Sequence, residues 1–189
     1  MKKLVFLLEE PSMKELLTII LPKIIPNNFI FQCISHNGKR ELEKSIPIKT
    51  RGWKEPNIRF VIIHDKDSAD CINLKNEIYN KIHEARRSDT LIRIVCTELE
   101  SWYLGDLEAV ESGYNVNLSK YKSKAIFRNP DTVVNAKQEL RKLVPEYQPI
   151  NGSIAIAQFM DISKNKSHSF NVFINGIEKL IHESETYHD

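Results

Sequence analysis

Apolar runs alternate with amphipathic stretches along the first 112 residues. Four short runs are almost continuously apolar, as is typical of strands that are buried on both faces of a sheet. The stretches between them repeat apolar residues at helical spacing. The predicted strands are Lys3–Leu8, Asn28–Ile34, Ile58–His64 and Leu91–Cys96.

A helix is predicted after each of these strands. The first one carries the capping pattern Ser12-x-x-Glu15 at its start. Strands that alternate with helices predict an α/β fold, with a Rossmann-like, mainly parallel sheet flanked by helices. The predicted helices are Ser12–Ile25, Gly38–Ser45, Ser68–Arg87 and Glu100–Val110.

The pattern changes after Ser112, where a polar loop leads into further helices but no clear strand. We therefore predict a single domain over residues 1–189, because this length suits one α/β core with some appended helix. Its core spans about residues 1–112, and a mainly helical C-terminal extension spans about 113–185. The predicted helices of the extension are Asp131–Leu143, Ser153–Met160 and Phe170–His182.

Composition places the chain among ordinary soluble proteins, with 28% charged and 41% hydrophobic residues. The apolar run LVFLL near the start is too short for a signal peptide or a membrane span. We expect a cytoplasmic protein without membrane contact. Three cysteines without a CxxC pair predict reduced thiols and neither disulfides nor a zinc site.

Positive charge is concentrated in two segments, although the net charge is only +2. Residues 37–59 and 119–142 each contain seven lysines and arginines against fewer acids. Such segments could attract a polyanion such as nucleic acid. Ordinary solvated surface explains either segment equally well.

Acidic residues follow three of the four predicted strands. Parallel strands end at the same edge of a sheet, so side chains that follow them can meet there. Carboxylates that share a small space repel one another unless a cation neutralises them. Hard oxygen ligands without thiolates suit Mg²⁺ or Mn²⁺. The candidate ligands are Glu9 or Glu10 after the first strand, Asp65 and Asp67 after the third, and Glu98 and Glu100 after the fourth.

Each of these acids has a structural alternative when it is considered by itself. Asp67 or Ser68 could cap the helix that is predicted to begin near Ala69. His64 is better explained by packing or hydrogen bonding at the strand end than by metal ligation. The agreement of three strand ends nevertheless favours a metal site.

These motifs resemble a known catalytic domain. A glutamate after the first strand and an Asp-x-Asp after a later one are similar to the Toprim domain of topoisomerases, bacterial primases, small ribonuclease-maturation enzymes and overcoming-lysogenization-defect nucleases. The chain is also similar, from Leu7 to about Phe173, to a small bacterial family of Toprim-like proteins of unassigned function. The motifs that carry this likeness are LLEEPSMKELL, ISHNGKREL, VIIHDKDSADC, CTELESWYLGD and SHSFNVF.

The resemblance implies a metal-dependent site that processes phosphodiesters. Glu9 matches the Toprim glutamate, a general acid or base, and Asp65 and Asp67 match the metal-binding pair. Glu10 is an alternative, because Pro11 and Ser12 follow it where Toprim motifs usually have a glycine. The resemblance also implies that Glu98 and Glu100 serve a second metal, and that an ABC-type ATPase encoded in a bacterial defence locus is the partner.

Our leading hypothesis is an Mg²⁺-dependent nuclease, the effector or accessory subunit of such a system. Lys39 or Lys66 could stabilise the charge that develops on the phosphate. A homo-oligomer is compatible with the sequence, which does not distinguish DNA from RNA.

Two alternatives stay open. A receiver-like phosphoacceptor domain would use the acidic pair after the first strand, Asp65 as acceptor and Thr97 as the hydroxyl. A non-catalytic Toprim-like binding subunit would keep the fold without turnover.

Overall fold

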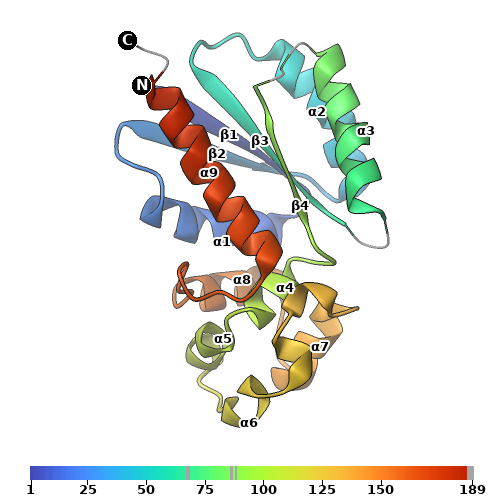
Figure 1. Cartoon of the computed structure of the whole chain (residues 1–189), viewed down its shortest axis with the longest axis vertical. Helices are drawn as coiled ribbons and strands as arrows, with labels where there is room; N and C mark the ends of the chain where they lie inside the picture. The colour runs from blue at the N-terminus through green and yellow to red at the C-terminus, as the bar shows by residue number, and fades with distance from the viewer. Residues whose placement is uncertain (67–68, 86, 88, 187–189) are drawn as a thin grey trace.

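The fold is built around one parallel sheet. The computed structural model describes residues 1–66, 69–85, 87 and 89–186. The strand order is β2-β1-β3-β4, and every neighbouring pair is parallel (Figure 1). The strands are β1 (Lys2–Leu8), β2 (Phe29–Ser35), β3 (Ile58–Asp65) and β4 (Leu91–Val95). The predicted class, an α/β fold with a parallel sheet flanked by helices, is confirmed.

Helices follow each strand and make up most of the C-terminal part. No helix in the described part of the chain is long and apolar enough to cross a membrane. The helices are α1 (Pro11–Ile20), η1 (Leu21–Lys23), α2 (Lys39–Gly52), α3 (Cys71–Glu84), α4 (Glu100–Leu104), α5 (Leu107–Tyr114), α6 (Ser119–Lys122), η2 (Ala125–Phe127), η3 (Pro130–Thr132), α7 (Ala136–Leu143), α8 (Pro149–Ala157) and α9 (His168–Thr186).

Both faces of the sheet are buried, as the apolar strands require. Successive side chains of a strand point to opposite faces. Leu4 and Phe6 of β1 pack in the core that includes α1 and α9, whereas Val5 and Leu7 pack in the core that includes α2 and α3. All four side chains are fully buried. The result is a three-layer arrangement with the sheet in the middle (Figure 1).

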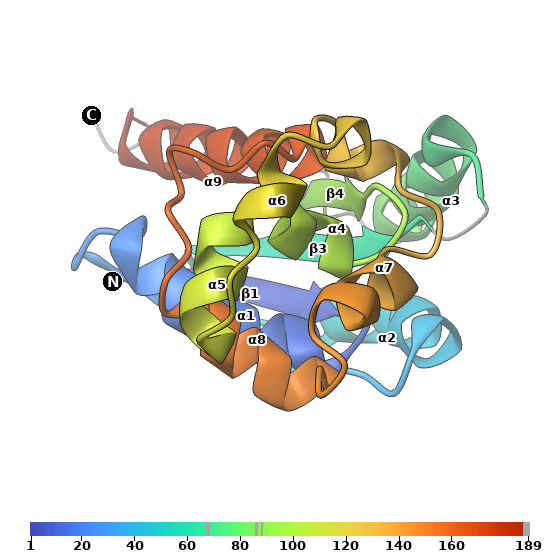
Figure 2. The same cartoon turned by 90° about the horizontal axis from the view of Figure 1, so that it is seen from below.

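The C-terminal helices do two different things. The helices from α4 to α8 gather at the end of the molecule towards which the strands point (Figures 1 and 2). In contrast, α9 returns along the sheet beside β4, and α8 packs against α1. The carboxyl edge of the sheet therefore lies next to a helical layer that is made up of α4 to α8.

The start of α1 differs from the predicted capping box. The helix begins at Pro11, and Glu10 is its N-cap residue. Proline fits this first position because its missing N–H would have no partner there. The hydroxyl of Ser12 donates to Glu10 Oε2 at 3.2 Å instead of capping the helix. The predicted helix is also too long, since η1 replaces its last turn.

Two other helix boundaries follow from capping aspartates. Asp70 caps α3 by accepting hydrogen bonds from the N–H groups of Ile72 and Asn73. The predicted capping positions 67 and 68 lie outside the described residues. Asp106 accepts from the Ala109 N–H at 3.0 Å and caps α5, so the helix predicted over Glu100–Val110 is two helices.

The three cysteines form no disulfide with one another in the structure. They are partly buried, and burial raises the pKa of Cys33 to about 12 and that of Cys96 to about 11. Cys71 is the first residue of α3.

Candidate functional site

The carboxyl ends of β1 and β3 bring Glu9 and Asp65 together. Glu9 Oε2 accepts a hydrogen bond from the Asp65 N–H at 3.2 Å. Glu10 lies beside them, and the three acids line one crevice with Ser12, Met13, Ile63 and Leu99. The crevice has a volume of about 10 Å³, roughly enough for one water-sized group.

The loop between β2 and α2 fixes the main chain at Glu9. The His36 N–H donates to the Leu8 carbonyl at 3.0 Å, and the Gly38 N–H donates to the Glu9 carbonyl at 2.9 Å. The buried His36 ring also lies between the Leu8 carbonyl, 2.7 Å from Nδ1, and the Ser45 hydroxyl, 2.6 Å from Nε2. Gly38 has φ = 99°, a conformation that favours glycine.

Lys39 is the first residue of α2, directly after this loop, and its side chain is half-buried. The loop that holds the Glu9 main chain therefore also fixes the position of the Lys39 backbone.

His64 connects the crevice to helices α2 and α3. Its Nδ1 lies 2.7 Å from the Asp65 carbonyl oxygen and 3.2 Å from Glu9 Oε2. Its Nε2 lies 3.3 Å from Glu43 Oε1, and Lys81 Nζ donates to the other Glu43 oxygen at 2.9 Å. Burial by itself would raise the pKa of Glu43, but Lys81 and His64 outweigh it and lower that pKa.

His64 forms hydrogen bonds at the strand end, as the sequence predicted, but the sequence did not indicate its partners. Glu43 lies 21 positions from His64 in the chain, and Lys81 lies 38 positions from Glu43. Neither carries a local motif, so only the packing of α2 against α3 reveals the network.

Glu98 and Glu100 already have structural partners. Glu98 Oε2 accepts from the Lys137 N–H at 2.9 Å, in the first turn of α7. Glu100 is buried, and its Oε1 accepts from the Tyr147 hydroxyl at 2.9 Å with Lys137 Nζ at 3.7 Å. Burial raises the pKa of Glu100. Neither residue lines the crevice of Glu9 and Asp65.

Glu98 instead faces a second groove beside the crevice. This groove has a volume of about 600 Å³ and lies at the ends of β3 and β4. It is lined by Lys66, Thr97, Glu98, Asp131, Thr132, Val134 and Asn135.

The crevice suits a hard divalent cation in donor type, because its polar lining includes three carboxylates and no thiolate. Asp67, the second acid of the predicted pair, lies outside the described residues. Over residues 1–66, 69–85, 87 and 89–186, no three or more His, Cys, Asp or Glu side chains are grouped closely enough to hold a metal ion. The predicted ligand set therefore stays a prediction.

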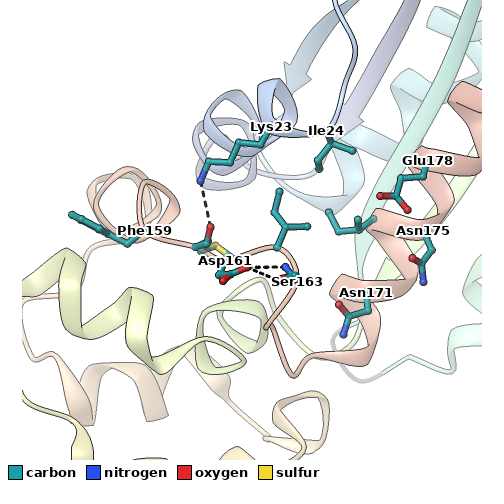
Figure 3. Close-up of a pocket in the computed structure, with 11 residues that line it drawn as sticks. Lys23, Ile24, Phe159, Asp161, Ser163, Asn171, Asn175 and Glu178 are labelled. Carbon is teal, nitrogen blue, oxygen red and sulfur yellow. Dashed lines mark hydrogen bonds between the residues drawn. The ribbon is translucent and has the colours of Figure 1, made fainter.

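Another groove has a volume of about 780 Å³, and Figure 3 shows the residues that line it. Lys23 closes one side of it by donating to the Met160 carbonyl at 3.3 Å. Asn171, Asn175 and Glu178 of α9 line another side. None of the predicted site residues that the structure describes lines this groove.

Comparison with known proteins places the chain in a family. A family model described as a domain of unknown function, DUF4276, matches residues 8–178. The chain belongs to the DUF4276 family. The matched span of this DUF4276 chain includes every candidate site residue, and no curated protein matches the chain.

A solved structure shares the fold of this DUF4276 chain. It is the C-terminal region of the OLD protein of Xanthomonas campestris pv. campestris, with a TM-score of 0.55 and 13% identity. The similarity covers 100% of the DUF4276 chain and 97% of the other chain. At this identity the likeness concerns the fold.

Proposed function

We propose that this chain is a nuclease that hydrolyses phosphodiester bonds of DNA or RNA with Mg²⁺ or Mn²⁺. The observation that carries the proposal is the meeting of Glu9 and Asp65 in one crevice at the carboxyl edge of a parallel sheet. Functional groups of such sheets gather at this edge. The Toprim-like motifs and the structural likeness to the OLD region support the same class of activity.

Glu9, Asp65 and Asp67 would hold the cation, which would activate water and neutralise charge on the phosphate. Glu9 would also move a proton as general acid or base, with Glu10 as the alternative. His64 contacts the Glu9 carboxylate, and Glu43 holds the other side of the His64 ring. Glu98 would contribute to a second cation from the neighbouring groove. Glu100 is the weakest candidate ligand, because its carboxylate is buried against Tyr147.

Lys39 and Lys66 are the candidate positively charged side chains near the carboxyl edge of the sheet. Lys39 follows the loop that fixes Glu9, and Lys66 lines the groove beside the crevice. We propose that one of them stabilises negative charge on the phosphate as the new bond forms.

The partner proposal has two supports. The sequence resembles proteins that accompany ABC-type ATPases in bacterial defence loci. The structural neighbour is described as a C-terminal region, so the OLD protein has a further region beside this fold. We propose that this chain has a separate ABC-type ATPase protein as its partner.

The direct test is cleavage of single- and double-stranded DNA and RNA by the purified chain with Mg²⁺ or Mn²⁺. Asp65→Asn and Glu9→Gln should each lower the rate at least 100-fold, since each removes a proposed metal contact (an order-of-magnitude expectation). Glu77→Gln, on the exposed face of α3, is the matched control and should cleave normally. Equal cleavage by all four proteins would refute the assignment of these residues.

The receiver-like alternative is less well supported. A receiver needs a lysine after a fifth strand, but the sheet formed by the described residues ends at β4. Labelling of Asp65 by acetyl phosphate would favour the receiver, and intact function without the carboxylates would favour a binding subunit.

A further inference from the structure

Thr97 has a backbone conformation that is costly for its side chain. It lies two residues after the end of β4, and its φ is 64°. The left-handed region is uncommon for any residue with a Cβ and a genuine outlier for a β-branched one. The other non-glycine residues with positive φ in the described part are all asparagines, which tolerate this region; they are Asn57, Asn115 and Asn135.

The Thr97 side chain has a second unfavourable feature. Its hydroxyl oxygen is buried and has no hydrogen-bond partner, and no other side-chain polar atom in the described residues shares this state. A buried polar group without a partner costs free energy that folding must supply. One residue thus combines backbone strain with an unsatisfied hydroxyl.

Neighbouring contacts hold this turn in place on both sides. The Ser101 hydroxyl donates to the Cys96 carbonyl at 2.9 Å, just before Thr97. Glu98, just after it, is fixed by the Lys137 N–H at 2.9 Å. The surrounding structure therefore imposes a conformation that threonine itself disfavours, a pattern that concentrates at functional sites.

Thr97 forms part of the wall of the 600 Å³ groove beside the Glu9–Asp65 crevice. Lys66 and Glu98 line the same wall, at the ends of β3 and β4. A strand of nucleic acid whose phosphate contacted a cation held in the crevice would have to continue into an adjoining space. This groove is such a space.

We propose that the groove binds the phosphodiester segment next to the cleaved bond, and that Thr97 contacts it. Rotation about the Thr97 Cα–Cβ bond would turn the hydroxyl from its buried position into the groove, where it would donate to a phosphate oxygen. The rotation breaks no hydrogen bond, because the hydroxyl makes none now. This inference rests on the proposed nuclease function and adds a substrate-contacting residue to it.

Three substitutions separate the hydroxyl from the strain. Thr97→Ala removes the hydroxyl, Thr97→Ser keeps it, and Thr97→Gly removes both the hydroxyl and the strain. The readouts are kcat and KM on a defined oligonucleotide with Mn²⁺, together with the melting temperature without metal. Thr90→Ala is the matched control, since Thr90 lies just before β4, at its other end, and its hydroxyl is satisfied by the Arg87 carbonyl at 2.9 Å.

We expect Thr97→Ser to cleave nearly as well as the original chain. Thr97→Ala and Thr97→Gly should lose about tenfold in kcat/KM, mainly through a higher KM, as expected for a lost hydrogen bond to a charged group. Thr97→Gly should melt at a higher temperature despite its lower activity. The control should cleave normally.

Full activity of Thr97→Ala, or equal loss in Thr97→Ala and Thr97→Ser, would overturn the assignment of the hydroxyl. If Asp65→Asn is inactive while Thr97→Ala is fully active, the nuclease stands and only this inference fails. If the original chain cleaves neither DNA nor RNA with either metal, the proposed function fails and this inference fails with it.

Discussion

At the scale of single residues, the acids at the strand ends divide into two groups. Glu9 and Asp65 lie in the crevice, whereas Glu98 and Glu100 make contacts with α7 and Tyr147. The sequence predicted the meeting of the first two, because parallel strands place their ends at one edge. It gave no means of separating Glu100 from them, because its burial depends on Tyr147, 47 positions away.

Glu100→Gln tests this division through the pH dependence of stability. Because burial raises the pKa of Glu100, the folded state holds this proton more tightly than the unfolded state. The contribution of Glu100 to the free energy of unfolding is therefore largest below the ordinary glutamate pKa of 4.5 and falls as the pH rises through the raised pKa. Glutamine keeps an acceptor for Tyr147 without the charge.

We expect Glu100→Gln to melt at or above the temperature of the original chain at pH 8 and to lose that advantage below pH 4.5. Thermal melts across pH 4–9 measure this. A variant that is less stable at pH 8 would mean that the Glu100 charge stabilises the fold and would contradict the raised pKa. Loss of Mn²⁺-dependent cleavage with intact stability would return Glu100 to the candidate metal ligands.

At the scale of elements, the order and type of the strands were predictable and the helix ends were less so. Continuous apolar runs identify buried strands without knowledge of their neighbours. Helix ends depend on single capping groups such as Asp70 and Asp106, which compete with nearby residues of similar chemistry. The course of α9 depends on a close approach that has no sequence signal: Gly176 lies against the Arg93 side chain, whose Nε donates to the Val172 carbonyl at 3.1 Å.

Gly38→Ala tests the loop that fixes Glu9. A Cβ at this position would meet no atom within 4 Å, so the cost comes only from the left-handed backbone at φ = 99°. We expect a loss of roughly 1 kcal/mol in the free energy of unfolding, and lower cleavage because the Glu9 main chain shifts. Urea denaturation measures the first effect.

Gly52→Ala is the matched control, because its Cβ also has open space but its φ is not positive. It lies at the end of α2 and should be neutral or slightly stabilising. Equal destabilisation by both substitutions would mean that the Gly38 loop carries no special constraint.

At the scale of the whole molecule, positive charge on the helical layer could guide a polyanion to the sheet edge. Lys120 and Lys124 are exposed and lie 5.1 and 4.4 Å from the centre of the Tyr121 ring. Cations beside an aromatic ring form a common surface for nucleic acid strands. The sequence showed the charge excess, but not that α6 lies at the end of the molecule beyond the strand ends (Figure 1).

Reversal of both charges, Lys120→Glu with Lys124→Glu, should weaken nucleic acid binding at least tenfold at low salt and reduce the dependence of binding on salt. Fluorescence anisotropy with Ca²⁺ in place of Mg²⁺ measures this without cleavage. The control reverses two exposed lysines elsewhere, Lys75 on α3 and Lys179 on α9. An equal loss in both double variants would indicate a general effect of net charge rather than a binding surface.

The proposed metal site is best tested by locating Mn²⁺ with anomalous diffraction from crystals of the full chain. We expect an ion held by carboxylate oxygens of Glu9 and Asp65 in the crevice, and its loss in Asp65→Asn. An ordered ion bound elsewhere, or a crevice without Mn²⁺ at millimolar concentration, would contradict the proposal that these acids form a metal-dependent catalytic site.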